Sequence, residues 1–354
     1  MDLRAFGWDA FFERHFEEHR GRGLTPARVT LEHQHIYTVQ TAEGESLATV
    51  AGGLRHRAAG RNEFPAVGDW VALTPPGQGR RGIIQVILPR RSKFSRKVAG
   101  RETTEQVVAA NIDTVFLMMG LDNDYNLRRI ERYLITARDG GASPVVVLNK
   151  ADICDDVDAR VREVQSVAQP APVLAVSTKQ GGLIGILDAY LIPGRTIALL
   201  GSSGVGKSTL VNRLVGHQMQ QTREVRANDD RGRHTTTRRE LIMVTNGALL
   251  IDTPGLRELQ LWDSAGGMDA TFDDIEGLGA GCRFRDCHHD AEPGCAVKLA
   301  VDAGQLDSSR LESYRQLRRE RAFLLGQQDE RAAQERKRQS RTISKIIRDF
   351  KPRE

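Results

Sequence analysis

The sequence lacks the apolar segments that a membrane-spanning or secreted protein would carry. No apolar run approaches the ~20 residues that a helix needs to cross a bilayer. The N-terminus, Met1-Asp2-Leu3-Arg4-Ala5-Phe6, has no basic stretch followed by an apolar core, which argues against a secretory signal. We therefore expect a cytoplasmic protein without a membrane partner, and nothing in the sequence suggests more than a monomer.

Cysteine is also scarce, with four in 354 residues. So few thiols cannot form a disulfide framework, and three of them lie within Cys282–Cys295. This clustering favours a reduced protein with one metal site, and it leaves Cys154 as an ordinary thiol.

A strong charge excess is missing too, because 51 Lys and Arg face 46 Asp and Glu. The basic residues are concentrated locally instead. Residues 310–354 hold 14 Lys and Arg against 7 Asp and Glu, and the run Arg90–Lys97 has five cations and no acid. Each run alone could be a solvated surface, but two separate basic segments favour an extended phosphate-rich partner such as RNA.

The length predicts two or three domains of roughly 100–200 residues each. Up to about Gly100 the pattern indicates short strands without a long helix, typical of a small barrel such as an OB-fold, although another antiparallel sheet would look similar. The strands are expected at Arg28–Gln40, Ser46–Ala51, Asp69–Thr74 and Gly82–Leu88.

From about Asn111 strands and helices alternate, which predicts a parallel sheet with helices on both faces. Beyond about Asp263 a Gly- and Cys-rich loop precedes a helix-forming segment. We therefore expect an RNA-binding barrel over 1–100, an α/β domain over 101–262, and a helical metal-binding domain with a basic tail over 263–354. The alternating elements are the strands Ile112–Met119, Pro144–Leu148, Pro172–Val176, Thr196–Leu200 and Ala248–Ile251, and the helices Asn126–Arg138, Val157–Ala168, Leu183–Leu191 and Lys207–Leu214.

One segment has the spacing of a P-loop, two glycines bracketing four residues and followed by Lys-Ser. It reads Gly201-Ser202-Ser203-Gly204-Val205-Gly206-Lys207-Ser208-Thr209 and lies between an expected strand and an expected helix. Its backbone N–H groups would surround phosphates. Lys207 would neutralise the β and γ phosphates as a catalytic group, and Ser208 would bind Mg²⁺.

A second segment, Asn149-Lys150-Ala151-Asp152, follows the strand expected at Pro144–Leu148 and predicts guanine as the base. The Asp152 carboxylate can accept hydrogen bonds from N1–H and the 2-amino group of guanine, whereas adenine has an acceptor at N1 and no 2-amino group. Ser177, after the next strand, is placed to support the base.

A third segment, Asp252-Thr253-Pro254-Gly255, matches the Asp-x-x-Gly element, in which the aspartate holds Mg²⁺ through water and the Gly255 amide senses the γ-phosphate. A polar stretch before it, Asn228–Thr237, suits a switch loop, and one of Thr235, Thr236 and Thr237 would complete the Mg²⁺ shell. Leu256 stands where related enzymes carry a water-orienting glutamine, which predicts slow hydrolysis. His234, within the switch loop, is the candidate catalytic replacement.

The order of these motifs differs from that of a Ras-like GTPase, because the base-reading segments precede the P-loop. Cutting and rejoining a chain at its surface keeps a site intact in space while permuting it in sequence. We therefore expect a circularly permuted GTPase domain in which Asp252–Gly255 leads into the C-terminal domain.

The cysteine loop has the pattern Cys-x4-Cys-x-His-x5-Cys, which indicates a closed structural zinc site. Its donors are Cys282, Cys287 and Cys295 with one imidazole, and both His288 and His289 are candidates for the fourth ligand.

Taken together, the chain resembles the circularly permuted small-ribosomal-subunit biogenesis GTPases of the RsgA/YjeQ type. The resemblance is carried by 64–71 (FPAVGDWV), 96–100 (RKVAG), 126–134 (NLRRIERYL), Gly232–Thr237, the nucleotide motifs and the cysteine loop. It implies an N-terminal OB-fold, a permuted GTPase domain and a C-terminal zinc domain, with His289 rather than His288 as ligand. It also implies slow, subunit-stimulated GTP hydrolysis, binding to ribosomal RNA, and help in late subunit maturation and release of assembly factors.

Two other functions are compatible with the sequence. In one, GTP only switches RNA affinity and turnover is incidental. In the other, the protein is a GTP-dependent translation factor that acts on complete ribosomes.

Overall fold

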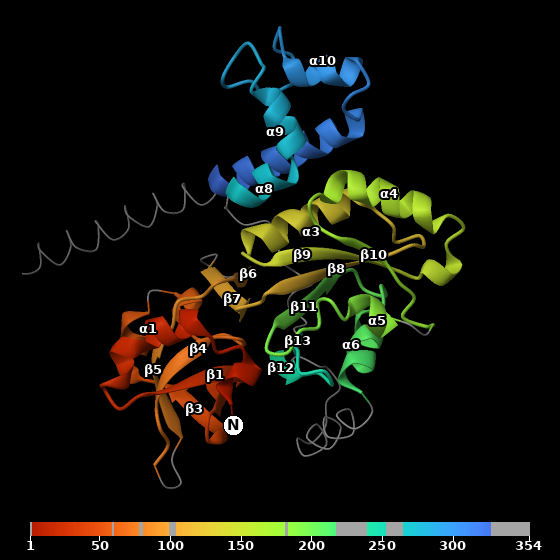
Figure 1. The fold of residues 1–354 in the computed structure, drawn as a ribbon. Coiled ribbons are helices and arrows are strands. Elements are labelled where there is room, and N and C mark those ends of the chain that lie inside the picture. Colours follow the sequence, from red (N-terminus) through yellow and green to blue (C-terminus); the bar gives the residue numbers. More distant parts are fainter. Residues whose placement is uncertain are drawn as a thin grey trace, which may run out of the picture. The chain divides into compact units, whose positions relative to one another are not determined.

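The computed structural model describes residues 2–58, 60–77, 81–98, 104–180, 183–216, 239–252 and 265–326. The chain divides into two compact units, Met1–Gln260 and Leu261–Glu354. The first unit contains a barrel and an α/β layer, and the second is helical (Figure 1).

The barrel is formed by five strands in the order β1-β2-β3-β5-β4, and β4 pairs back onto β1 to close it. All neighbouring strands are antiparallel except β3 and β5. Alternate residues such as Val29, Val39 and Ile84 point inward and are fully buried. The strands are β1 Thr25–His33, β2 Ile36–Thr41, β3 Gly44–Val50, β4 Trp70–Thr74 and β5 Gly82–Ile87.

Two expectations about this region are wrong. The segment Arg28–Gln40 is not one strand, because Gln34 and His35 adopt positive φ angles of 48° and 67° and turn the chain into a hairpin. The region also contains a helix, α1 Ala10–Arg20, which begins where the Asp9 carboxylate caps the N–H of Phe11. Short helices complete the region at η1 Leu3–Phe6, α2 Gly52–Arg57 and η2 Arg61–Glu63.

The α/β layer contains a sheet in the order β10-β9-β8-β11-β13-β12, parallel except for β12. This confirms the expected parallel sheet. Its strands are β8 Thr114–Gly120, β9 Ser143–Asn149, β10 Val173–Ala175, β11 Thr196–Gly201, β12 Arg239–Met243 and β13 Leu249–Asp252.

Helices cover both faces of this sheet (Figure 1). On β8, Leu117 and Met119 contribute to the core beneath α3 and α4, whereas Phe116 and Met118 contribute to the core beneath α5 and α6. The central strands are buried on both faces, which is why they are continuous apolar runs. The helices are α3 Leu127–Asp139, α4 Val157–Ala168, α5 Leu183–Leu187 and α6 Lys207–Val215, with η3 Ala151–Ile153.

Barrel and α/β layer share one continuous sheet of eleven strands. The end of β1 pairs with β12, with Leu31 opposite Glu240 and Glu32 opposite Arg239. A separate hairpin, β6 Lys93–Val98 and β7 Thr104–Ala110, leads from the barrel into β8. The sequence pattern indicated neither this hairpin nor β12.

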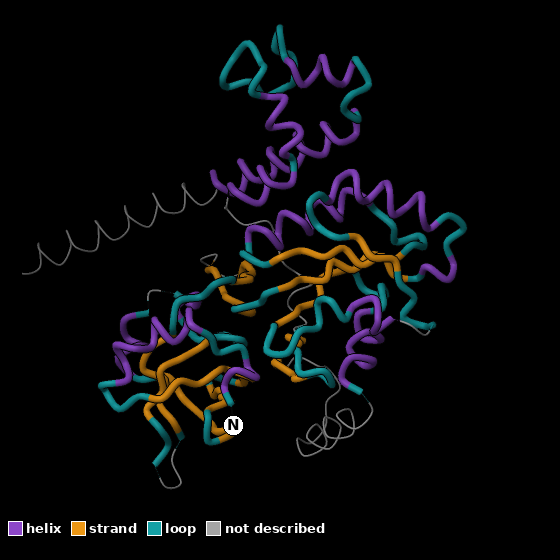
Figure 2. Tube along the Cα trace, in the orientation of Figure 1, coloured by secondary structure: helices purple, strands orange, loops and turns teal. Residues whose placement is uncertain are grey.

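The second unit has α8 Ala265–Thr271, α9 Asp273–Gly279, α10 Ala296–Asp302 and a helical segment over 308–326. The segment between α9 and α10 is loop (Figure 2), as the sequence predicts. Among the described residues of either unit, no helix has the length and apolar character to span a membrane.

Candidate nucleotide site and metal centre

The expected P-loop connects β11 to α6 and is curled around its own lysine. The ammonium group of Lys207 donates hydrogen bonds to the carbonyl oxygen of Gly201 at 2.6 Å and to that of Ser202. Gly204 and Gly206 have φ angles of +78° and +104°, a region that residues with a side chain rarely adopt. The loop therefore places a buried cation where a helix begins, the arrangement that binds phosphate.

Asn149 ties this loop to the segments expected to read the base. It ends β9 and is 1% exposed. Its Nδ2 donates to the carbonyl oxygen of Val205 at 2.7 Å and to the Thr178 hydroxyl at 2.9 Å, while its Oδ1 accepts from the Thr178 N–H at 2.8 Å. One side chain thus connects three loops that are far apart in sequence.

Position 206 needs a glycine for two reasons: its positive φ angle and its close approach to the side chain of Asn149. A Cβ atom at position 206 would lie 2.3 Å from Nδ2 of Asn149. Any side chain there would displace Asn149, and through it the segment that begins at Lys150.

Asp152 lies in η3, directly after β9, and is exposed. A hydrogen bond from the Ser177 hydroxyl, the largest influence, holds the pKa of Asp152 below its usual value. The carboxylate is therefore ionised at neutral pH and keeps its acceptor oxygens. That is the state needed to accept the two N–H groups of guanine.

Two aspartates that the sequence reasoning missed also reach this site from the loop after β8. Asp122 forms an ion pair with Lys150. Asp124 accepts a hydrogen bond from the Ser202 hydroxyl and pairs with Arg129. A signal for them was present in the sequence, because both aspartates follow directly after a buried strand that is a neighbour of the P-loop strand. Parallel neighbouring strands end at the same edge of the sheet, so residues that follow them lie near one another.

The Mg²⁺ side of the site is described only in part. Ser208 lies in the first turn of α6, and Asp252 ends β13, which runs parallel to β11. Both therefore reach the sheet edge at which the P-loop begins. Gly255, His234 and the three switch threonines Thr235, Thr236 and Thr237 lie outside the described residues.

The second unit brings together Cys282, Cys287, His289 and Cys295, whose donor atoms all lie within 4.8 Å of one another. The Sγ atoms of Cys282 and Cys295 are 3.9 Å apart, and Nδ1 of His289 lies 3.6 Å and 3.4 Å from them. Tetrahedral bonds of about 2.1–2.3 Å would separate the donors by about 3.5–3.8 Å. The four residues therefore fit a single tetrahedral metal ion.

The backbone shapes this cluster. His289 has a φ of +62°, in the left-handed region that few residues other than glycine adopt. Burial is the main influence on Cys287 and raises the pKa of its thiol to about 11. A metal ion favours the thiolate form of its cysteine ligands, so metal binding to this cluster would release protons.

The sheet is parallel, and the loop that carries Lys207 leads into α6. The segments that contain Asn149 and Thr178 reach the same site but precede this loop in the sequence. Together these features define a circularly permuted P-loop GTPase. A family model described as RsgA GTPase matches residues 87–262. A relative from Opitutus terrae, named small ribosomal subunit biogenesis GTPase RsgA, is 49% identical over 91% of this chain and 90% of its own length.

Solved structures agree with the fold. YjeQ from Thermotoga maritima aligns with a TM-score of 0.63 at 29% identity, covering 84% of this chain and 99% of that chain. YloQ, described as a circularly permuted GTPase, aligns with a TM-score of 0.61 at 24% identity, covering 85% and 96%. The chain belongs to the RsgA family of GTPases and is a GTP hydrolase, which confirms the resemblance and the permuted fold.

Proposed function

We propose that this protein hydrolyses GTP on the small ribosomal subunit, where it assists late maturation and the release of assembly factors. GTP binding at this site is supported by Asn149, which links the phosphate-binding loop to the proposed base-reading segment through Val205 and Thr178. The choice of the subunit is supported by the name of the relative from Opitutus terrae.

Within the site, we assign Asp152 to the guanine base, with Asn149, Lys150, Ala151 and Ser177 forming the pocket around it. Gly201–Thr209 would surround the phosphates, with Lys207 as the catalytic cation. Magnesium would balance phosphate charge when bound with GTP, held by Ser208, by one switch threonine and through water by Asp252, while the Gly255 amide would sense the γ-phosphate. His234 is the proposed group that orients water.

For the metal centre we propose zinc, because three thiolates and one imidazole form a donor set that zinc prefers. All four positions of a tetrahedron would be filled by protein. The ion would therefore hold the fold of the second unit and leave no open position for chemistry.

Ribosomal RNA is the proposed partner of the barrel and of the basic C-terminal segment, in the cytoplasm and with the protein as a monomer. The run Arg90–Lys97 offers less positive charge to RNA than its composition suggests, because acids from elsewhere in the chain pair with Arg90, Arg91 and Lys93. Arg96 donates to Oε1 of Gln106 at 3.2 Å, and Arg315 and Arg319 pair with acids of their own unit. The tail after Arg331 lies outside the described residues.

The test is GTP turnover by the purified protein with and without isolated small subunits. We expect strong stimulation, tighter subunit binding with a non-hydrolysable GTP analogue than with GDP, and steep salt dependence. Charge reversal at Arg96 and Lys97 should weaken subunit binding and leave basal turnover unchanged.

Absent stimulation together with nucleotide-dependent RNA binding would indicate a GTP-switched RNA-binding module. Stimulation by complete ribosomes alone would indicate a translation factor. Equal subunit affinity in both nucleotide states would show that GTP does not control binding.

A further inference from the structure

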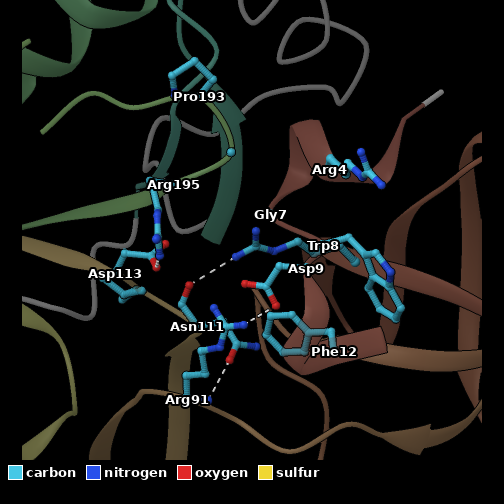
Figure 3. Close-up of a pocket in the computed structure, with 13 residues that line it drawn as sticks. Arg4, Gly7, Trp8, Asp9, Phe12, Arg91, Asn111, Asp113, Pro193 and Arg195 are labelled. Carbon is cyan, nitrogen blue, oxygen red and sulfur yellow. Dashed lines mark hydrogen bonds and ion pairs between the residues drawn. The ribbon is translucent and has the colours of Figure 1, made fainter. Parts of the chain in front are cut away.

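A cavity of about 180 Å³ lies where the N-terminal segment and β1 meet the loop before β8 and the turn before β11. Figure 3 shows it with Arg195 and Asp113 on one side and Trp8 and Phe12 on the other. Its charged lining consists of Arg4, Arg28, Arg91, Arg195, Asp9 and Asp113, two more cations than anions. We refer to it as the seam cavity.

The most buried of these cations is Arg28, on β1, which is 2% exposed. It donates to the carbonyl oxygens of Phe6, Gly68 and Asn111 and to the Thr196 hydroxyl. None of these acceptors is charged, and no carboxylate among the described residues pairs with it. Burial, the main influence, lowers the pKa of Arg28 to about 10.

The two aspartates of the cavity already have partners. Asp9 pairs with Arg91, whose guanidinium lies 4.6 Å from the ring centres of Phe11 and Phe12. Asp113 accepts from Arg195 at 2.7 Å and from the Thr196 N–H at 2.8 Å. Neither aspartate contacts Arg28 directly, although the negative charges of Asp113 and Asp69 attract it through space and oppose the lowering of its pKa.

We propose that the seam cavity binds one phosphate group, either free orthophosphate or a backbone phosphate of RNA. Four of the five N–H donors of Arg28 are already engaged, so an anion there would accept at most one hydrogen bond from it. It would be attracted mainly by the charge of the buried guanidinium, which is poorly screened by water. Arg4 and Arg195, both largely exposed, would complete its shell from the open side. The volume is below the ~300–1,000 Å³ of ordinary small-molecule pockets, which favours a single small anion.

The seam cavity is separate from the nucleotide site. Thr196 begins β11 and Gly201 ends it, so the cavity and the P-loop lie at opposite ends of a strand about 17 Å long. Arg28 lies on the barrel strand β1 and donates to Thr196 on the strand that leads to the P-loop. A phosphate bound to Arg28 would therefore strengthen the link between the barrel and that strand. A ligand that binds only the folded seam stabilises it.

The first experiment tests free phosphate on the full-length protein, with the P-loop filled by a non-hydrolysable GTP analogue and Mg²⁺. Thermal unfolding is followed as phosphate replaces chloride at constant ionic strength, and crystals are soaked in tungstate. We expect a higher Tm with phosphate and a tungstate peak in the seam cavity. Arg195→Gln and Arg4→Gln should each weaken the phosphate affinity obtained from the Tm titration about tenfold. Arg162→Gln, on the exposed face of α4, should leave this affinity unchanged.

The second experiment distinguishes RNA as the source of the phosphate. Binding of a short single-stranded RNA is measured against salt for the same variants. If RNA supplies the phosphate, orthophosphate has no effect, while Arg195→Gln and Arg4→Gln weaken RNA binding and reduce the salt slope by about one. The proposal is overturned if Arg195→Gln and Arg4→Gln change the binding of neither orthophosphate nor RNA. It is also overturned if Arg162→Gln weakens binding as much as they do.

Discussion

The phosphate-binding loop and the Cys/His cluster are ordered in different ways. The loop is held by residues far away in sequence, since Asn149 reaches Val205 across 56 positions and Thr178 across 29. The four residues of the cluster fall between Cys282 and Cys295, flanked by helices of only seven residues, α9 and α10. Helices that short do not persist alone in water.

This difference indicates where each site obtains its stability. The nucleotide loop is preorganised by a buried sheet and by side-chain hydrogen bonds, so it needs no ion to keep its shape. The cluster gathers three thiols and an imidazole that have little reason to stay together without a cation. Losing the metal should therefore affect the second unit and spare the first.

The largest expected effect comes from Cys287→Ser. Removing one ligand should release the metal and loosen residues 265–326, which limited proteolysis would detect as new cleavage in that segment. Cys154→Ser removes a thiol outside the cluster and serves as the control. Elemental analysis that finds no zinc in the wild-type protein would contradict the assignment.

Asp152→Asn should have the next largest effect. The amide presents a donor to the guanine edge, and each unpaired contact costs about 1–3 kcal/mol, so GTP affinity should fall by roughly 100-fold. Xanthine nucleotides, which offer an acceptor in place of the 2-amino group, should bind the variant better than the wild-type protein. Unchanged GTP affinity would show that Asn149–Asp152 does not read the base.

Gly206→Ala tests the connection between the two halves of the nucleotide site. Its matched control is Gly204→Ala, because both glycines have positive φ but only a Cβ at 206 meets Asn149. We expect GTP affinity about tenfold weaker in Gly206→Ala than in Gly204→Ala. Equal losses would mean that backbone strain alone matters and that the contact with Asn149 does not.

Asp122→Asn should have the smallest effect. Its ion pair with Lys150 is partly exposed, and such pairs contribute ~0.2–1 kcal/mol, so GTP affinity should fall only a few-fold. Asp155→Asn, an exposed change beyond η3, should have no effect. A loss as large as that of Asp152→Asn would give Asp122 a direct part in binding.

Sequence was sufficient where the signal is local. Buried parallel strands are continuous apolar runs, and loop motifs follow them directly, so β11 and the start of α6 lie where the spacing of Gly201–Lys207 predicts. The cluster of Cys282–Cys295 was equally visible, because its members are close along the chain.

Contacts between distant segments could not be predicted in this way. The bridge from Asn149 to Thr178 depends on how three loops meet in space. The run Arg90–Lys97 contains no acid, yet the buried carboxylate of Asp69 pairs with Arg90 through both oxygens. In the barrel, the positive φ angles at Gln34 and His35 divided what the β-forming composition of Arg28–Gln40 suggested was one strand.

The contrast between the two sites is tested most directly by GTP affinity before and after metal removal. The full-length protein would be stripped with a chelator under reducing conditions, its metal content measured, and binding of a fluorescent GTP analogue compared with the untreated protein in excess Mg²⁺. We predict affinities equal within about twofold, since a twofold change is well under 1 kcal/mol. Loss of GTP binding on metal removal would contradict the account.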